Sequence, residues 1–513
     1  MAFFSFFSSF SSSSSSLSLI SKWSLAQLAT VSLLVLLTAV GIVIIQMRAS
    51  RPNLPRDAPS LFRGWPVFGS VDFFRGRRDF LLRGRDLSPS RQFSFFYGPH
   101  PIVAVSGAAA RASFFTSRGL DLGAGFAALY AATPSIDHLP ESNLSVNFSL
   151  HAKRLLQRER LEATLPQMVA DADLAIATTE SVMEPFALML RLVYQLTHRT
   201  LGSNDVADDA GLLDETLAVF GRLDNSSALE IMFPKLFTPN KLRKLIAGLK
   251  LHRAFSRVVD ERRRSGRKDD DAMQVLMDVT DSNVQISSFI ISALFAGLIN
   301  STFNAAWILV YLAETPEWYD QIRTEVDAAI AKRRVSPDET APKTLTRLTL
   351  ADWETDFPLV ELAMRETIRL IGRGVCMRKN VSGKDIEIGD SGLVIPKDAF
   401  AVCGLEDAHM DGSLYEDPDR WDPNRYMPGR EEDKKGQHAF VGWGSGLHPC
   451  LGMRFAKLEI TITTVTMFAH YDFTRCDKLG DDISSPLPGL VRSSIGEKRP
   501  THDVFLKCTP RCC

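Results

Sequence analysis

The sequence predicts a mainly α-helical protein with a minor β part, preceded by a single N-terminal transmembrane helix. An uncharged, apolar stretch of 24 residues, Ser24 to Met47, is long enough to cross a membrane. Segments with apolar faces at helical spacing follow, and the longest of them, Ile286 to Leu312, is hydrophobic nearly all round. Short β-like runs alternate with Gly, Asp and Pro near Ile386–Phe400, which indicates a small sheet.

The composition is that of an ordinary globular protein. Of the 513 residues, 45% are apolar and 23% are charged, which is enough material for a deep core. The net charge of −1 gives no basic excess of the kind that binds nucleic acid, so no nucleic-acid partner is predicted. The seven cysteines are irregularly spaced and form no CxxC pair, which argues against both a disulfide framework and a structural zinc site.

The N-terminal region divides into three segments. Residues 1–23 are rich in Ser and Phe and cannot build a core. Residues 24–47 would reach roughly 36 Å as a helix, more than a hydrocarbon core of about 30 Å, and this run is too long for a cleaved signal sequence. Residues 48–69 contain four prolines and are expected to form a stiff hinge to a body that spans residues 70–513.

The charges that flank the apolar stretch predict its orientation. Lys22 precedes the stretch, whereas Arg48, Arg51 and Arg56 follow it. Because cytoplasmic flanks carry the excess of basic residues, the body is expected on the cytosolic side of the membrane. The predicted arrangement is a single-pass membrane protein with the lipid bilayer as a partner.

Two further helical stretches and one loop are predicted within the body. Leu155–Val182, with a break at Pro166, and Ser203–Phe233 have apolar faces at helical spacing. The run Arg262–Asp271 consists largely of Arg, Lys and Asp, and it is predicted to be a solvated loop between helices.

A glycine-rich loop near the C-terminus carries the strongest chemical signal. It runs from Trp443 to Gly452 and contains Cys450 just before an apolar helix, Met453 to Thr466. Glycines let the backbone approach a flat cofactor closely, and exposed N–H groups together with a helix N-terminus favour a negative sulfur. Two interpretations stay open on the loop alone: a thiolate ligand, or a buried cysteine in a glycine-rich turn.

This loop resembles the haem loop of the cytochrome P-450 family, which reads aromatic-x-x-Gly-x-basic-x-Cys-x-Gly. Trp443 takes the aromatic position, Gly446 the first glycine, His448 the basic position, Cys450 the ligand position and Gly452 the last glycine. The chain departs from the usual Phe at the first position and the usual Arg at the basic one. The resemblance implies haem b (iron protoporphyrin IX) with an axial thiolate from Cys450, and a haem-propionate contact from His448.

Two more motifs extend the resemblance. Glu366-Thr-Ile-Arg369 matches a Glu-x-x-Arg pair whose spacing puts both side chains on one helix face. Arg378 stands where the family places an arginine that pairs with a haem propionate. The segment from Asp417 ends in Arg425, which in the family joins the Glu and Arg in a buried ionic triad. The resemblance therefore implies structural roles for Glu366, Arg369 and Arg425.

The long core helix carries a fourth motif, and here the chain departs from the family. The family usually reads Ala-Gly-x-acid-Thr-Thr/Ser, whereas this chain has Ala296 and Gly297 but Ile299 for the acid and Asn300 for the threonine. In the family, Gly297 leaves room above the iron, and the acid and alcohol help to deliver protons. Asn300 can hold a water or donate a hydrogen bond, but it is no acid. The next hydroxyl, on Ser301, is rotated by about 100° from Asn300.

Asn at this position resembles the branch that contains sterol hydroxylases and prostacyclin synthase, so two functions are compatible with the sequence. The favoured one is a monooxygenase that inserts one oxygen atom from O2 into a lipophilic molecule. The alternative is an oxygen-independent isomerase or dehydratase that acts on a peroxide. A haem protein that only binds or senses a ligand is a third class, which steady substrate-dependent consumption of reductant would exclude.

The resemblance also implies partners and a location. Membrane-bound members receive electrons from NADPH through NADPH–cytochrome P-450 reductase, and they lie at the endoplasmic reticulum membrane. The candidate side chains for docking the reductase are Arg454, Lys457, Lys153, Arg154 and Arg158. Family substrate pockets draw on stretches near residues 120–150 and 220–250, where Phe, Leu, Ala and Ile are frequent, so an apolar ligand is expected. The motifs are similar to those of fungal members that modify terpenoids or sterols in specialised metabolism.

Overall fold

The computed structural model describes most of the body and a few positions of the N-terminal region. The described residues are 27, 29–34, 37, 38, 41, 45, 51–130, 144–223, 227–233, 236–372, 374–490 and 499–511. The predicted segment 1–23 lies outside the described residues. Those positions of the predicted membrane anchor, 24–47, that are described are helical.

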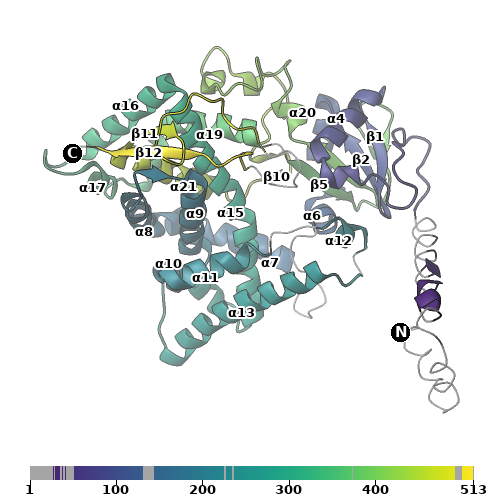
Figure 1. Ribbon diagram of the computed structural model, residues 1–513, viewed down its shortest axis with the longest axis horizontal. Coiled ribbons are helices and arrows are strands. Elements are labelled where there is room, and N and C mark those ends of the chain that lie inside the picture. The colour runs from purple at the N-terminus through teal and green to yellow at the C-terminus, as the bar shows by residue number, and fades with distance from the viewer. Residues whose placement is uncertain are drawn as a thin grey trace.

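The helical part is built around α15 (Asn283–Glu314), as Figure 1 shows. This helix covers the predicted apolar run and packs against α9 (Pro185–Leu201), α13 (Pro239–Ser265) and α21 (Met453–His470), with α8 (Arg158–Ala177) behind α9. Among the described residues it is the one helix long and apolar enough to cross a membrane. Because most of its side chains are buried inside the protein, α15 is the core helix of the body.

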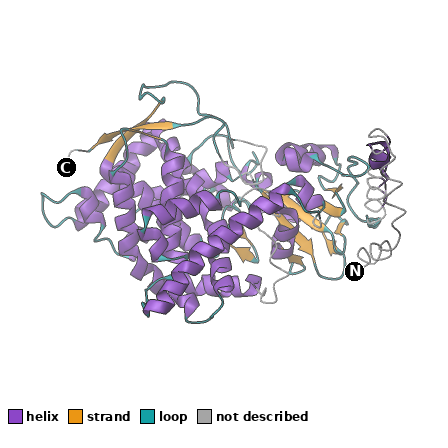
Figure 2. Ribbon diagram, turned by 60° about the horizontal axis from the view of Figure 1, so that its bottom comes forward, coloured by secondary structure: helices purple, strands orange, loops and turns teal. Residues whose placement is uncertain are grey.

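The β part lies at the other end of the body. A five-stranded sheet has the order β1-β2-β8-β5-β3, and its β2 and β8 strands are parallel while the other neighbours are antiparallel. A three-stranded sheet, β11-β12-β4, lies beside the C-terminus, and β6 pairs with β7. Figure 2 shows helices filling most of the molecule, with the strands gathered at two ends. The strand bounds are β1 Phe93–Tyr97, β2 His100–Val105, β3 Leu120–Asp121, β4 Val182–Met183, β5 Val375–Asn380, β6 Ile386–Glu387, β7 Val394–Ile395, β8 Phe400–Gly404, β9 Gly444–Ser445, β10 His448–Pro449, β11 Tyr471–Cys476 and β12 Phe505–Pro510.

These elements confirm the prediction of a mainly α protein with a minor β part, including a small sheet near Ile386–Phe400. The remaining helices are α3 Asp72–Arg75, α4 Arg77–Leu87, α5 Ala108–Thr116, α6 Leu122–Tyr130, α7 Leu144–Leu155, α10 Asn204–Asp208, α11 Ala210–Phe220, α12 Ala228–Met232, α14 Ala272–Met277, α16 Pro316–Arg333, α17 Ala341–Leu345, α18 Leu350–Thr355, α19 Pro358–Ile371 and α20 Glu406–His409, with 3₁₀ turns η1 Pro423–Tyr426 and η2 Glu432–Lys434.

The structure corrects two helix boundaries. The predicted break at Pro166 is wrong, because α8 continues through the proline. Burial of Leu165, Met168 and Val169 against the core offsets the cost of about 3 kcal/mol that a proline imposes on a helix interior. The predicted helical stretch Ser203–Phe233 is divided in the structure into three short helices, α10, α11 and α12.

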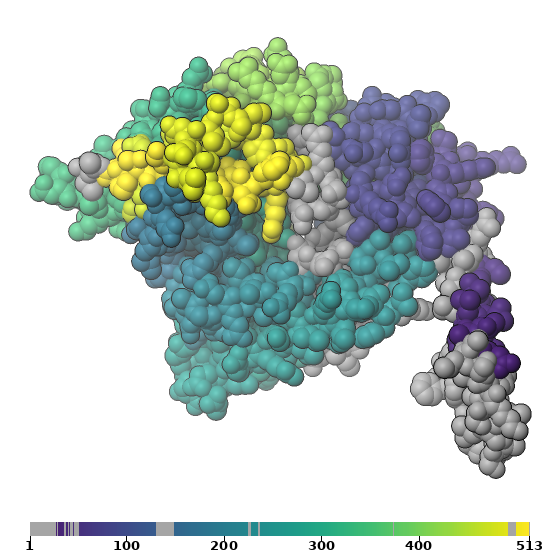
Figure 3. Space-filling model, in the orientation of Figure 1, coloured from purple at the N-terminus to yellow at the C-terminus, as the bar shows by residue number. Residues whose placement is uncertain are grey.

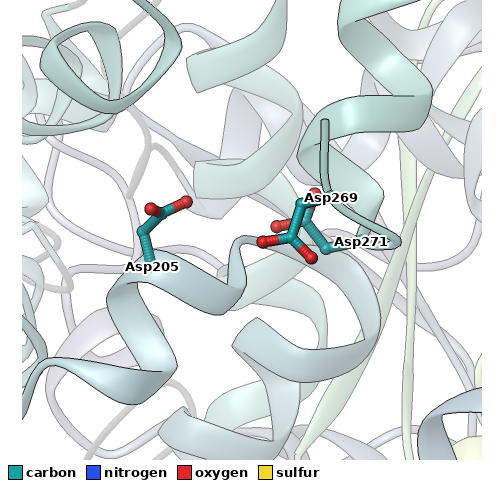
Figure 4. A group of neighbouring side chains, drawn as sticks. All are labelled: Asp205, Asp269 and Asp271. Carbon is teal, nitrogen blue, oxygen red and sulfur yellow. The ribbon is translucent and has the colours of Figure 1, made fainter. Parts of the chain in front are cut away.

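The prediction of a solvated loop over Arg262–Asp271 is wrong at both of its ends. Arg262 lies in α13 and is completely buried, and Asp271 is buried as the N-cap of α14. The Arg262 guanidinium donates to Asp271 at 2.8 Å and to Asp205 at 2.9 Å, and it lies 3.6 Å from Asp269. Figure 4 shows the three carboxylates converging. Their oxygens lie within 4.8 Å of one another, and the Arg262 guanidinium pairs with all three carboxylates, while Arg267 also pairs with Asp205.

Candidate active site

The glycine-rich loop forms a short hairpin that packs against helix α5. Strands β9 and β10 pair antiparallel, with His448 opposite Ser445. Gly446 stands at the turn with φ +62°, and a Cβ there would lie 2.2 Å from the carbonyl oxygen of Phe115. The N–H of Leu447 donates to that same carbonyl at 3.1 Å. Only glycine fits this position, because any larger residue would push the loop away from α5.

Cys450 lies at the end of this hairpin, directly ahead of α21. Its N–H donates to the carbonyl of Trp443 at 2.7 Å, which ties the two ends of the loop together. The residue is exposed, and neighbouring protein atoms partly surround its thiol. Burial raises the pKa of the Cys450 thiol, and a hydrogen bond from the N–H of Gly452 lowers it. The same N–H and the N-terminus of α21 stabilise negative charge on the sulfur and so favour its thiolate form.

Arg378 brings a buried positive charge beside the loop. It projects from β5, is 2% exposed, and lies over the rings of Phe114 and Phe115 at 4.9 and 5.5 Å. Its Nε and Nη1 have no hydrogen-bond partner in the part of the chain that the structure describes. Burial lowers the pKa of Arg378, and burial together with this arginine lowers the pKa of His448. The structure therefore brings Arg378 and His448 into one neighbourhood.

The middle of α15 has a short exposed face. Between Ile286 and Ala313, every residue of this helix is buried or half-buried except Ala296 and Asn300, which share a face at a spacing of four. Gly297 lies next to them, and the nearest heavy atom to a Cβ there would be 3.9 Å away, on Thr197. Ser301 is 3% exposed and points elsewhere. Because Ala296 and Asn300 are exposed on an otherwise buried helix, this face of α15 borders an internal space.

Sequence reasoning missed a buried acid next to this wall. Glu459 lies on α21, nine residues after Cys450, and is completely buried. Burial raises its pKa to about 8, and the hydroxyl of Ser301 beside the carboxyl lowers the pKa in part. Neither carboxyl oxygen has a partner with full hydrogen-bond geometry among the described residues. Only the three-dimensional packing of α15 on α21 could reveal this group, because Glu459 lies 158 positions after Ser301 in the chain.

The predicted triad residues are in contact. Glu366 accepts hydrogen bonds from Arg369 at 2.7 Å and from Arg425 at 3.1 Å, and all three side chains are at most 1% exposed. Sequence reasoning missed Glu432, which pairs with Arg425 at 2.9 Å. Two carboxylates thus balance two guanidinium groups, so the cluster carries no net charge in the core.

The candidate basic residues for partner docking lie at the surface. Lys153, Arg154 and Arg158 are exposed on α7 and α8. Arg454 pairs with Glu354 at 2.5 Å, and Lys457 pairs with Glu361. These pairs are partly exposed, so they contribute little to stability and leave the side chains accessible to a partner.

Comparison with known proteins decides the family. The family model described as cytochrome P450 matches residues 149–498. The cytochrome P450 monooxygenase AacuE of Aspergillus aculeatus is 31% identical over 86% of this chain and 92% of its own length. The chain belongs to the cytochrome P450 family. A second relative, the cytochrome P450 monooxygenase nsrP of Aspergillus novofumigatus, is 32% identical over 87% of this chain and 89% of its own length.

More distant relatives agree with the assignment of this chain to the P450 family. The sterol 14-demethylase of Arabidopsis thaliana is 28% identical over 58% of the chain and 59% of its own length. The solved structure of retinoic acid-bound cyanobacterial CYP120A1 superposes with a TM-score of 0.71, covers 90% of this chain and all of its own, and is 19% identical. The latter establishes the P450 fold, and the family makes this chain a monooxygenase, an oxidoreductase.

P450 enzymes hold a haem through a cysteine thiolate, and the residues present fit such a group. Cys450 offers an accessible sulfur whose charge a backbone N–H and a helix N-terminus would stabilise. Arg378 offers a buried cation whose Nε and Nη1 lack a partner among the described residues, which suits a propionate. Leaving such a cation unpaired in the core would be costly, so an anion is the natural partner.

Proposed function

We propose that this P450 inserts one oxygen atom from O2 into a lipophilic small molecule, and that the thiolate of Cys450 would hold the iron of haem b. The observation that carries the proposal is the exposed Cys450 ahead of α21, in a loop whose His448 lies near the buried and incompletely paired Arg378. The haem, when bound, supplies the oxygen-activating redox chemistry, and the thiolate tunes it. The protein supplies the anchoring, the orientation and the protons.

On the proximal side, the loop residues hold and shape the haem. Arg378 and His448 bind its propionates, since both are cationic or hydrogen-bonding groups in one neighbourhood. Gly446 lets the loop lie against α5, and the N–H of Gly452 stabilises negative charge on the sulfur. Trp443 anchors the loop through its carbonyl and packs its ring against the core.

On the distal side, the exposed face of α15 lines the substrate space. Gly297 has no side chain to fill the space beside this helix face, and Ala296 offers a small apolar contact. Asn300 orients a water or substrate oxygen through its amide. An amide carries no dissociable proton near neutral pH. Protons must therefore reach the site through water held by Asn300 and not from a side-chain acid at this position.

Ile299 and Asn300 favour a second candidate, an oxygen-independent isomerase or dehydratase that acts on a peroxide. A peroxide already contains the bond to be rearranged, so such an enzyme needs no acid and no reductant. The two candidates separate in one assay: a monooxygenase loses product formation when O2 or NADPH with reductase is withheld, whereas an isomerase does not. In the monooxygenase, Asn300→Thr should retain or improve the coupling of NADPH use to product.

The substrate class, redox partner and location are parts of the same proposal. We place the substrate among terpenoid- or sterol-like molecules of specialised metabolism, since one plant relative is named a sterol 14-demethylase. Electrons come from NADPH through NADPH–cytochrome P450 reductase, which docks on the basic side chains of α7, α8 and α21. Residues 24–47 anchor the chain in the endoplasmic reticulum membrane, and residues 48–69 connect the anchor to the cytosolic body, residues 70–513.

The first test is the carbon monoxide difference spectrum of the reduced protein in isolated membranes. A strongly red-shifted Soret band is expected for the wild type and for the control Cys403→Ala, in which another buried cysteine is removed. Cys450→Ala should lose this band and all product formation. A wild type with the band of a neutral ligand, or a Cys450→Ala variant with the red-shifted band, would overturn the ligand assignment.

A further inference from the structure

His438 stands just before the glycine-rich loop in an uncommon backbone conformation. Its φ is +55°, in the left-handed region that few residues with a side chain adopt and in which His and Asn are enriched. Residues held in this region cost free energy and cluster at functional sites. The side chain of His438 is therefore a candidate for a role beside the site.

The imidazole of His438 bridges the loop and helix α5. Its Nδ1 lies 2.6 Å from the hydroxyl oxygen of Ser445, and its ring centroid lies 5.4 Å from that of Phe115. Ser445 stands opposite His448 in the hairpin. The carbonyl of Phe115 accepts a hydrogen bond from the N–H of Leu447. One side chain thus contacts both the turn of the loop and the helix residue on which that turn rests.

The backbone that follows His438 is anchored to the buried part of the body. The carbonyl of Ala439 accepts a hydrogen bond from the hydroxyl of Tyr415 at 3.2 Å. The N–H of Val441 donates to Nε2 of His409 at 3.0 Å. Both Tyr415 and His409 are completely buried. The imidazole of His438 therefore projects from a fixed piece of backbone.

The loop beyond this anchor is rich in glycine. Gly442, Gly444 and Gly446 alternate with residues that carry side chains, and the last two of these glycines have positive φ. Glycine leaves a chain more conformational freedom than any other residue does. Figure 3 shows the segment that leads into the loop, in light green, at the surface of the molecule. A side-chain contact from a fixed point therefore restricts the loop where its glycines would let it move.

The surroundings of His438 favour a neutral imidazole with its proton on Nδ1. Burial lowers the pKa of His438, and the charge of Arg111 lowers it further. Its Nε2 is buried and has no hydrogen-bond partner among the described residues. A buried lone pair without a partner costs less than a buried N–H without one, so Nε2 is left without the proton. The N–H of Nδ1 then donates to the hydroxyl of Ser445.

We propose that His438 is a positioning residue for the glycine-rich loop. Through Ser445 it holds the turn of the loop against α5, and it thereby fixes where His448 and the Cys450 thiolate stand relative to the haem. The proposal deepens the proposed function and rests on it, because it concerns the loop that would hold the iron.

The hydrogen bond, and not the bulk of the ring, is the part of this contact that positions the loop. Any apolar ring could fill the space beside Phe115, but it would leave the hydroxyl of Ser445 free to turn away. Asn adopts positive φ readily, and its short amide reaches about as far as Nδ1 of a histidine. Asn at position 438 is therefore expected to replace the histidine, whereas Phe is not.

The test follows the reduced carbon monoxide complex of the full-length protein in isolated membranes. The measured quantity is the rate at which the red-shifted Soret band converts into the band of a neutral ligand on mild warming. Ser445→Ala and His438→Phe should each convert about fivefold faster than the wild type, the factor expected for one lost hydrogen bond. Ser445→Thr and His438→Asn, which keep the bond, should convert at the wild-type rate.

A double variant and a matched control separate this role from a general loss of stability. His438→Phe combined with Ser445→Ala should convert no faster than the faster single variant, because both changes remove the same bond. The control is His252→Phe, which breaks a similar pair between α13 and α15, where Nδ1 of His252 lies 2.7 Å from the hydroxyl oxygen of Ser287. This variant should convert at the wild-type rate.

The outcomes distinguish this role from the ligand assignment. A wild-type conversion rate in Ser445→Ala would overturn the role of His438 while the thiolate ligand stands. Effects that multiply in the double variant would also overturn it, since they would show that the two side chains act independently. A wild type without the red-shifted band would overturn the ligand assignment and the role of His438 together.

Discussion

Replacement of Glu459 by Gln should make the protein more stable at neutral pH. The carboxyl group is completely buried, and burial raises its pKa from 4.5 in an unfolded chain to about 8. At pH 7 the folded protein therefore keeps the proton, whereas the unfolded chain has released it. Between pH 4.5 and 8 the unfolded state binds fewer protons, so the free energy of unfolding falls as pH rises.

The size of the effect follows from this interval. Each pKa unit corresponds to about 1.4 kcal/mol, so ionisation of Glu459 in the unfolded chain lowers stability by about 3 kcal/mol between pH 4.5 and pH 7. Gln has a similar volume and does not titrate. With an unfolding entropy of about 0.9 kcal/mol/K for a body of roughly 440 residues, Glu459→Gln should raise the Tm by about 3 °C at pH 7 and by less than 1 °C at pH 5.

The assay is thermal unfolding of the purified holoenzyme, followed by circular dichroism between pH 5 and pH 8.5. The matched control is Glu387→Gln, which changes an exposed acid on β6 and should leave the Tm unchanged at every pH. Identical pH dependence of the Tm in the wild type and in Glu459→Gln would show that the buried carboxyl does not titrate differently in the folded and unfolded states, and the reasoning would be refuted.

Three further predictions concern charged groups. Arg425→Met should lower stability by about 3–5 kcal/mol, because it leaves Glu366 and Glu432 with fewer partners in the core; an unchanged Tm would contradict the buried network. Arg262→Met should destabilise by a similar amount, whereas EDTA or Ca²⁺ should not shift the wild-type Tm, since the Arg262 guanidinium already pairs with all three aspartates. Arg378→Leu should lower the ratio of Soret to protein absorbance by severalfold while the circular dichroism spectrum stays unchanged. The control Lys379→Leu, on the opposite face of β5, should retain the haem. Equal haem loss in both variants would argue against a propionate contact.

The helices could be predicted from the sequence where their buried faces are apolar. The run Ile286–Leu312 predicted α15 to within a few residues at each end, because a core helix needs apolar side chains all round. Pro166 misled the prediction, since local propensity cannot register how firmly tertiary packing holds α8. Arg262 misled it as well, because a charged run is buried only when the chain folds its counter-ions around it.

The main sheet escaped prediction for a different reason. Its strands come from residues 93–105, 120–121, 375–380 and 400–404, and two of its four pairings, β2–β8 and β3–β5, join segments far apart in the chain. The two-residue β3 has no periodicity to detect. Only the local pair β6–β7 produced a recognisable pattern of short apolar runs between turn residues.

Glu459 is a feature near the candidate site that could not be predicted from the sequence. The family's acid is missing from α15 at Ile299, and the structure places a buried acid on a different helix, next to Ser301. Ser301 is rotated by about 100° from Asn300 and is buried, whereas Asn300 lies on the exposed wall. Glu459 therefore belongs to the packing between α15 and α21, and Glu459→Gln should shift the pH dependence of stability without changing the turnover or the coupling of NADPH use to product. A loss of coupling with an unchanged pH dependence of the Tm would instead make Glu459 the proton source that α15 lacks.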